Sequence, residues 1–442
     1  MSSFRFTWII SRLRDHINNA LQLSRKPVKV SSLATPIKQP DFLRAEEPLA
    51  GYRLGGYHPI SIGDTLNERY KIERKLGWGE YSTVWLAHDL QTGEYRSVKI
   101  LTSVASITSK LHELEFLQHA AKYDPGHPGY SRVIRLLDHF RHSGPYGQHL
   151  CIVTELLGES VHDLTGYSTV NSVHPVPAKS ITRDILSGLD YLHKSGIIHT
   201  DLKLDNFLIE IDDMNSYVHR VLESSSIELY PEVQAADGRT ISYIPSTPLV
   251  IPIEDIEYHK PLRAKIVDLG VAVWESKIAE NYSDVVQPPS VRAPEVFLGA
   301  GWDSKCDIWS LGLLLIEMLR GRPALPVGDQ GDETLPLRVF CIFRLFGRFP
   351  TDLLERGKYS SEYFLPDGSF AYESPKNANK IPKWMELLDI YTEILHPDEY
   401  KRLMSFLEAA LQLRPEDRWS ASQLLEHEWI SSEARLLDIH YQ

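Results

Sequence analysis

The sequence predicts an α+β fold, with mainly strand-like segments on the N-terminal side and mainly helical segments after them. Three observations predict this arrangement. Short apolar runs of strand character recur between residues 66 and 157, the last of them at 150–153. Residues 308–319 form a longer apolar run that fits a buried helix. Residues 178–193 carry apolar side chains at helical spacing, namely Ile181, Ile185, Leu189 and Leu192.

The composition is that of a globular protein, with 43% hydrophobic and 24% charged residues. The net charge of −12 argues against nonspecific nucleic-acid binding and suits a basic protein partner. No transmembrane helix is expected, because the run at 308–319 is too short to span a bilayer and contains Glu317. The three cysteines lie in apolar runs without metal or disulfide spacing, so reduced core thiols in a reducing compartment are expected: Cys151, Cys306 and Cys341.

The N-terminal segment differs from the rest of the chain, and we expect residues 1–55 to form a basic tail, either disordered or used for targeting. Within residues 1–40 the basic residues face a single acid, Asp15, and the apolar residues at 4–17 could form one helical face. This pattern resembles a mitochondrial presequence. A disordered tail and a helix that docks on the remaining chain stay open as alternatives.

A glycine-rich turn is expected at residues 76–84, of sequence LGWGEYSTV, between two predicted strands. Glycines at 77 and 79 let the backbone approach phosphate groups where a Cβ atom would collide. Alone, such a pair more often marks an ordinary turn. Further along, Lys99 lies inside the apolar strand 97–100, where it would reach the α- and β-phosphates of a nucleotide. The helical stretch at 109–121 offers Glu113 and Glu115 as its acidic partner.

The strongest functional motif is residues 199–206, of sequence HTDLKLDN. Its spacing supplies what phosphoryl transfer needs: a carboxylate at Asp201 to orient and deprotonate a hydroxyl, an ammonium at Lys203, and an amide at Asn206 to help hold magnesium. Downstream, residues 264–270 read as a strand that ends in Asp268 and Gly270. An aspartate there is often only part of a turn, but after the preceding motif it is better interpreted as the main magnesium ligand.

The order of these motifs resembles the eukaryotic protein kinase fold over about residues 57–432. It is completed by APE at 293–295, DIWS at 307–310 and an arginine at 418. Lys203 is typical of serine/threonine kinases. Four further segments resemble the SR-protein kinases, which phosphorylate serines in arginine-serine repeats of splicing factors, and suggest a divergent, fungal member: 56–59 (GYHP), 75–79 (KLGWG), 199–201 (HTD) and 357–364.

The resemblance implies a small lobe at 56–157, a large lobe at 158–432 and a tail at 433–442. The large lobe would carry a spacer insert at about 212–262 and a second insert at about 325–385. The spacer could equally be a loop excursion with no function of its own.

The resemblance also implies ATP and Mg²⁺ as cofactors and assigns the site residues. Asp201 is the base, Lys203 neutralises the γ-phosphate, and Asn206 and Asp268 hold magnesium. The residues expected to bind ATP are Leu76, Gly77, Trp78, Gly79, Val84, Lys99, Glu113 (preferred to Glu115), Thr154, Glu155 and Leu157. Structural roles are expected for Asp307 under the catalytic loop, for Glu295 paired with Arg418, and for Arg292, which is typical of the group that includes the cyclin-dependent and mitogen-activated kinases.

Three residues depart from the family pattern. Thr200 replaces the arginine that normally binds a phosphate on the activation segment. Pro288 stands in place of a threonine that bridges the catalytic aspartate and lysine. Arg344 stands where an acid that docks arginine-rich peptides is expected.

The function expected from this resemblance is ATP-dependent phosphorylation of serine in protein substrates that are basic or rich in arginine and serine. A pseudokinase or scaffold with little turnover is the alternative, and a kinase of small molecules is a third reading. We expect a monomer without direct nucleic-acid contacts, located in the cytoplasm and nucleus, or in the mitochondrion if the N-terminus is a presequence.

Overall fold

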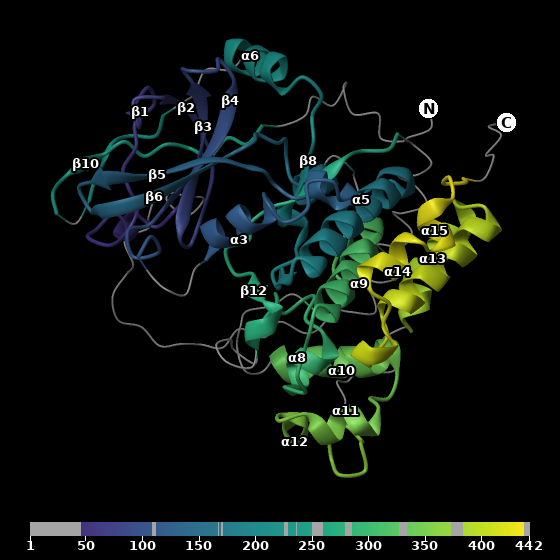
Figure 1. Ribbon diagram of the computed structural model, residues 1–442. Helices are drawn as coiled ribbons and strands as arrows, with labels where there is room; N and C mark the ends of the chain where they lie inside the picture. Colours follow the sequence, from purple (N-terminus) through teal and green to yellow (C-terminus); the bar gives the residue numbers. More distant parts are fainter. Residues whose placement is uncertain are drawn as a thin grey trace.

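The computed structural model describes residues 46–107, 112–166, 168, 171–224, 229–235, 237–249, 260–278, 285–326, 334–372 and 383–436. The chain forms two lobes, a β-rich one and a helical one (Figure 1). The presequence or docking helix expected within residues 1–40 lies outside the described residues, as does most of the expected C-terminal tail. None of the helices in the described ranges is long and apolar enough to cross a membrane.

The small lobe is built on a six-stranded antiparallel sheet with the strand order β1-β2-β3-β4-β6-β5. Side chains from one face of this sheet, among them Ile72, Trp85 and Val98, form a closed apolar core. Helix α3 (Glu113–Ala120) packs beside the sheet through Phe116 and Leu117. The strands are β1 (Thr65–Leu66), β2 (Tyr70–Gly79), β3 (Ser82–Asp89), β4 (Tyr95–Leu101), β5 (Leu136–Gly144) and β6 (Gly147–Thr154).

The large lobe is organised around two buried helices, α5 (Pro175–Lys194) and α9 (Lys305–Arg320). The apolar stripe of α5 is fully buried, and α9 is buried on nearly every side, which is why its sequence is apolar throughout. Two short sheets lie at the lobe junction: β7 (Ile197–Ile198) pairs with β12 (Val273–Trp274), and β8 (Phe207–Ile209) pairs with β11 (Ala264–Ile266).

Further helices complete the two lobes, most of them in the large lobe (Figure 1). Gly299, at the end of α8, has a φ of +63°, and the ring of Tyr359 lies where a Cβ atom of residue 299 would be, so the second insert packs tightly on α8. Apart from α6 of the spacer insert, the further helices within the described residues are η1 (Leu49–Gly51), η2 (Pro128–Arg132), α4 (Val161–Thr165), η3 (Leu204–Asn206), η4 (Glu275–Lys277), α8 (Pro294–Leu298), α10 (Thr334–Phe346), α11 (Thr351–Arg356), α12 (Ser360–Tyr363), η6 (Trp384–Glu393), α13 (Pro397–Ala410), η7 (Pro415–Asp417), α14 (Ala421–Leu425) and α15 (Glu428–Ser431).

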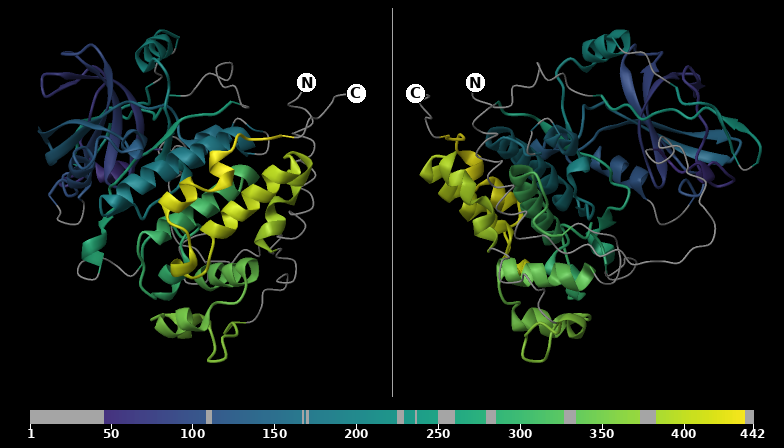
Figure 2. Two further views of the ribbon diagram at one scale, coloured as in Figure 1. Left: turned by 45° about the vertical axis from the view of Figure 1, so that its right-hand side comes forward. Right: turned by 180° about the vertical axis from the view of Figure 1, so that it is seen from behind.

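The spacer insert packs on the small lobe, although its sequence position suggested an excursion of the large lobe (Figure 2). Its helix α6 (Met214–Ser224) lies over β4, where the Asn215 side chain accepts a hydrogen bond from the Tyr95 backbone N–H (3.0 Å). Its strands β9 (Val233–Gln234) and β10 (Thr240–Ile241) form a hairpin. Ile244 then enters the apolar core of the six-stranded sheet. The insert is therefore part of the folded small lobe.

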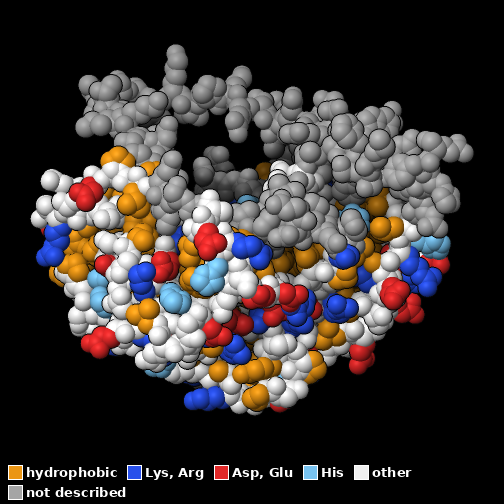
Figure 3. All heavy atoms as spheres, turned by 90° about the horizontal axis from the view of Figure 1, so that it is seen from above, with side chains coloured by type: hydrophobic (Ala, Val, Ile, Leu, Met, Phe, Trp, Pro, Cys, Tyr) orange, Lys and Arg blue, Asp and Glu red, His pale blue; other side chains and the backbone are white. Residues whose placement is uncertain are grey.

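Residues 46–55, which the sequence suggested were part of the tail, also belong to the small lobe. Glu46 and Glu47 are buried around the ammonium of Lys75 in β2, 2.8 Å from the nearer oxygen of Glu46. The insert closes this cluster, because the Tyr243 hydroxyl donates to the Glu47 carbonyl and the Ile244 carbonyl accepts from Lys75 (3.1 Å). Three distant segments are thus joined inside one lobe. The surface seen from above carries acidic and basic side chains interspersed (Figure 3).

Candidate active site

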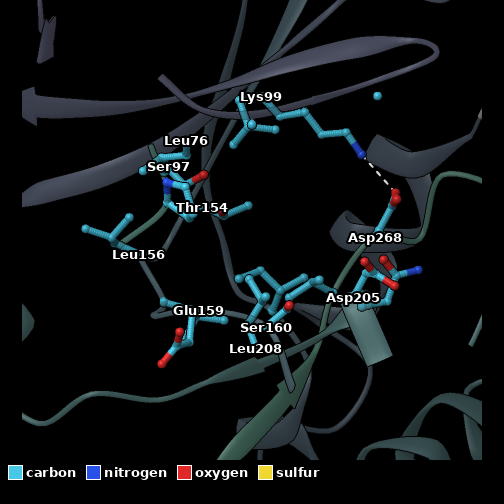
Figure 4. A pocket seen from close by; sticks show the side chains of 18 of the residues that line it. Leu76, Ser97, Lys99, Thr154, Leu156, Glu159, Ser160, Asp205, Leu208 and Asp268 are labelled. Carbon is cyan, nitrogen blue, oxygen red and sulfur yellow. Dashed lines mark hydrogen bonds and ion pairs between the residues drawn. The ribbon is translucent and has the colours of Figure 1, made fainter. Parts of the chain in front are cut away.

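A cleft of about 590 Å³ opens between the two lobes (Figure 4). The glycine-rich turn at 76–79 covers it from above, and β8 with Leu208 forms its floor. The site residues expected from the sequence that line it are Leu76, Gly77, Trp78, Gly79, Val84, Lys99, Glu113, Thr154, Glu155, Leu157, Lys203, Asn206 and Asp268. Asp201 is not part of the lining. It lies behind Lys203 and Asn206, which both contact it.

An ion-pair network joins the lobes across this cleft. The Lys99 ammonium lies 2.8 Å from Glu113 of α3. It also lies 2.8 Å from Asp268, which follows β11 (Figure 4). Burial alone would lower the pKa of Lys99, but the two carboxylates raise it, so the lysine is held as a cation. Lys99 in turn holds the pKa of Asp268 well below its usual range. Glu115, the other acid considered, accepts instead from the Trp274 indole.

The catalytic-loop motif is folded so that its polar groups contact one another. The Lys203 ammonium lies 3.0 Å from the Asp201 carboxylate. The Asn206 amide nitrogen donates to the Asp201 backbone carbonyl (2.9 Å), which leaves its amide oxygen for another ligand. Coulombic attraction to Asp201 raises the pKa of Lys203 against the opposing effect of burial. The loop therefore presents a fixed carboxylate, a cation and an amide at the mouth of the cleft.

Asp307 of α9 supports this loop from below. Its fully buried carboxylate accepts from the backbone N–H groups of His199 (2.9 Å) and Thr200 (3.0 Å) and from the His193 ring (2.9 Å). Although burial opposes ionisation, these donors hold the pKa of Asp307 below its ordinary value. They also hold Thr200 at a φ of +61°, a conformation that β-branched residues rarely adopt.

The activation segment is attached to the large lobe by direct bonds. The Thr200 hydroxyl donates to the Val271 carbonyl (2.9 Å), and β12 of the segment pairs with β7. Farther on, the buried Gln287 amide donates to the Cys306 carbonyl and to Ser310 (both 2.8 Å) and accepts from the Ala293 N–H (3.0 Å). Sequence reasoning missed Gln287, because a glutamine before two prolines carries no signal of burial.

Residues given structural roles lie beneath the segment. Arg418 and Glu295, both with 0% side-chain exposure, form a bidentate pair at 2.8 and 3.1 Å. The Arg292 guanidinium donates to the Val286 and Gln287 carbonyls (both 2.9 Å) and lies over the Phe297 ring. Burial lowers the pKa of Arg292 to about 10.

Two of the departures from the family pattern lie close to this region. The Pro288 carbonyl accepts from the Val291 N–H (3.0 Å), closing a turn in the activation segment. Arg344 lies on α10, and its Nε is buried with no hydrogen-bond partner among the described residues.

Part of the cleft wall comes from the spacer insert, which sequence reasoning did not anticipate. Pro248 and Leu249 line the cleft on the side of Leu76 and Leu156. Leu249 is buried against Leu86, Leu156 and the helix α6. Just before them, the Thr247 N–H donates to the Lys75 carbonyl of β2 (2.9 Å). The insert thus reaches the nucleotide-sized cleft as well as the outer face of the lobe.

The polar groups of the cleft fit a magnesium ion held together with phosphates. Asn206 and Asp268 line the same wall and offer oxygen atoms, which are the ligands that Mg²⁺ prefers. Because magnesium usually keeps one or two carboxylates plus substrate oxygens, this sparse protein donor set is sufficient.

Comparisons with known proteins agree with this geometry. The sequence profile of the protein kinase domain matches residues 70–220 and 254–430, so its gap falls in the spacer insert. "Serine/threonine-protein kinase SRPK" of Physarum polycephalum is 35% identical over 402 residues, covering 87% of this chain and 91% of that protein. "Protein kinase dsk1" of Schizosaccharomyces pombe is 28% identical, covering 87% and 85%. "SRSF protein kinase 3" of Homo sapiens is 26% identical, covering 90% and 94%.

The structural comparison agrees on the fold. A crystal structure of a kinase domain matches 85% of this chain and 98% of its own length with a TM-score of 0.63, at 21% sequence identity. The bilobal α+β fold expected from the sequence is confirmed. The relatives come from several kinds of organism, so a fungal origin is not shown.

Proposed function

This chain belongs to the protein kinase family, within its SRPK branch, and from that premise we propose the roles of its site residues. The protein is a serine/threonine protein kinase that uses ATP and Mg²⁺. The pseudokinase alternative finds no support, since the relatives are named as kinases. The observation that carries the proposal is the convergence of Lys99, Lys203, Asn206 and Asp268 on one cleft, with Asp201 fixed behind them.

In this proposal Asp201 is the base. Its carboxylate orients a substrate serine hydroxyl and accepts the proton as the serine oxygen bonds to the γ-phosphorus and the bond to the bridging oxygen of ADP breaks. Lys203 stabilises the charge on the transferring group, and Lys99, oriented by Glu113, holds the α- and β-phosphates. Asn206 and Asp268 would hold magnesium, which neutralises phosphate charge when bound. Thr154, Glu155 and Leu157 would lie along the adenine.

The substrates we propose are basic proteins, including segments rich in arginine and serine. The net charge of −12 and the names of the relatives support this class. Arg344 on α10 stands where an acid is expected in the docking region, whereas Arg338 of the same helix is buried and donates to the Pro326 carbonyl (3.1 Å). We therefore expect arginine-containing peptides to be phosphorylated without tight docking of long arginine-serine repeats.

We also propose that activity does not depend on phosphorylation of the activation segment. Thr200 has no guanidinium to read a phosphate, and its hydroxyl bonds the segment directly at Val271. Gln287 ties the following stretch to α9. These contacts supply the fixation that a phosphate would otherwise provide.

The chain is proposed to act as a monomer in the cytoplasm and nucleus. The buried, unbonded thiols of Cys151, Cys306 and Cys341 are compatible with a reducing compartment. Nothing in the comparisons supports the mitochondrial alternative, and no direct contact with nucleic acid is proposed.

The test is transfer of labelled phosphate from ATP, by protein purified from bacteria, to an arginine-serine peptide and to a generic basic protein. The matched variant is Asp201→Ala, which should lower the rate by about a hundredfold or more, as for positioned bases generally. Nucleotide binding should persist in the variant, because Asp201 does not line the cleft. Equal turnover by the two proteins would refute the role of Asp201.

A further inference from the structure

The tip of the glycine-rich loop is held by a residue from outside the sheet. The turn joining β2 and β3 comprises Gly79, Glu80, Tyr81 and Ser82. Tyr57 precedes β1 in the chain. Its hydroxyl lies 2.9 Å from the Gly79 carbonyl and 3.1 Å from the Glu80 carbonyl. From the other side, the Thr102 N–H donates to the Tyr81 carbonyl (2.8 Å). The turn is thus attached at both of its sides.

The Tyr57 side chain is itself fixed in place. Its ring is 5% exposed and lies directly against Gly51, where a Cβ atom would come within 2.6 Å of it. The Tyr52 ring packs beside it, with centroids 5.8 Å apart. The ring therefore has little freedom to follow the loop, so its hydroxyl acts as a stationary donor.

The backbone just before Tyr57 is hydrogen-bonded to segments of the small-lobe sheet. Gly55 accepts from the Val104 N–H (2.8 Å) and donates to the Tyr146 carbonyl (2.9 Å), which joins it to the end of β4 and to the β5–β6 turn. Gly56 accepts from the Ser103 N–H (3.0 Å). The backbone that carries Tyr57 is consequently anchored to the sheet. The turn that Tyr57 contacts, in contrast, lines the cleft.

We propose that Tyr57 is a positioning residue for the nucleotide phosphates. By bonding the carbonyls of the turn, its hydroxyl holds the backbone of Gly77–Gly79 at the height where that backbone meets the phosphates of ATP. Without this bond the turn must be ordered by the nucleotide itself, and the entropy of ordering reduces the affinity. This inference rests on the proposed nucleotide site.

The predicted effect depends on which part of the ligand the turn touches. Since the turn faces phosphates and not adenine, Tyr57→Phe should weaken ADP and ATP but leave adenosine binding unchanged. A single neutral hydrogen bond corresponds to about a 2- to 10-fold change in the dissociation constant. The KM for ATP should rise by a similar factor, with little change in the KM for the peptide.

The experiment measures ADP and adenosine binding by calorimetry, and kinetics with a basic peptide, for wild type, Tyr57→Phe and Tyr146→Phe. Tyr146 is the matched control, because it lies in the same aromatic cluster but its hydroxyl donates to Asp237 (3.3 Å). A lower affinity for ADP in Tyr57→Phe but not in Tyr146→Phe, with the affinity for adenosine unchanged, supports the inference.

Equal ADP affinity in wild type and Tyr57→Phe would overturn the inference, and so would a parallel loss of adenosine binding, which would indicate a general effect on the fold. The same loss in Tyr146→Phe would also overturn it. Failure of the wild type to bind ADP at all would instead refute the proposed nucleotide site. The two failures are therefore distinguishable.

Discussion

The buried lysine of β2 offers the sharpest test of how the insert is attached. The side chains of Lys75, Glu46 and Glu47 are 1%, 3% and 1% exposed, so the cluster is cut off from water. Replacing Lys75 by methionine fills similar volume but leaves two carboxylates facing each other without a cation. Removing one partner of a buried ion pair costs about 3–5 kcal/mol. We expect Lys75→Met to lose stability in this range.

A control for this change lies on the same strand. Lys71 pairs with Glu73 at 2.9 Å, but the lysine side chain is 45% exposed, so Lys71→Met should cost less than about 1 kcal/mol. Urea unfolding, followed by tryptophan fluorescence, measures how much unfolding free energy each of the two variants loses. Limited proteolysis adds a local measurement, because release of Tyr243 should expose the β9–β10 hairpin to cleavage in Lys75→Met only.

Removing the two carboxylate charges as well should rescue part of the stability that Lys75→Met loses. Combining Lys75→Met with Glu46→Gln and Glu47→Gln removes the uncompensated charge, so the triple variant should recover part of the lost stability. Two results would show that the cluster does not hold the insert. One is a loss of unfolding free energy in Lys75→Met no larger than that in Lys71→Met. The other is a triple variant that is less stable than Lys75→Met by the full amount of two further lost interactions.

Three further predictions concern regulation, pH and substrate. Phosphatase treatment, or alanine at Ser276, Ser283 and Ser290, should leave the rate of labelled-phosphate transfer unchanged; abolished activity that phosphorylation restores would contradict this. Burial, with His142 and His149 nearby, lowers the pKa of His58 to about 3. Because the unfolded chain then binds the proton first, stability should fall as pH drops from about 6.5 towards 3, and His58→Phe should flatten that dependence in urea titrations. Binding of a long arginine-serine repeat should weaken with added salt and tighten in Arg344→Glu; nanomolar, salt-insensitive binding by the wild type would refute it.

The chemistry of the cleft could be predicted from the sequence because it depends on short motifs. Lys99 lies within an apolar strand run, Asn206 and Asp268 belong to motifs that follow apolar runs, and the structure brings all three to one cleft. Glu113 could be preferred to Glu115 because residues 111–114 align best with the helix of the family, and the structure places its carboxylate 2.8 Å from Lys99. Contacts of this kind follow from the order of the strands, helices and motifs along the chain, and that order can be read from one sequence.

The attachment of the insert could not be predicted, because its contacts join distant segments. Lys75 meets Glu46 and Ile244 at separations of 29 and 169 positions. In the sequence, Glu46 and Glu47 look like solvated tail residues, and a lysine in a strand looks like an edge residue. These charged side chains can be buried because the lysine and the two glutamates neutralise one another. No single segment of the sequence shows that they will meet. Leu249 was missed for the same reason.

The contacts of Thr200, Gln287, Lys75 and Tyr57 share one physical property. Each holds a part of the kinase in place by bonds within the chain: the activation segment in the first two cases and the small lobe in the others. In kinases whose activation loop is ordered by phosphorylation, a phosphate provides such a hold instead. A ligand or a modification can shift a conformational equilibrium only by as much as its differential affinity for the two states. Because several bonds hold each part, we expect alternative conformations to be too sparsely populated for a weak signal to select. We therefore expect this kinase to be controlled through access to its substrates and its concentration, and its rate on a minimal basic peptide to be the same for freshly purified and phosphatase-treated protein.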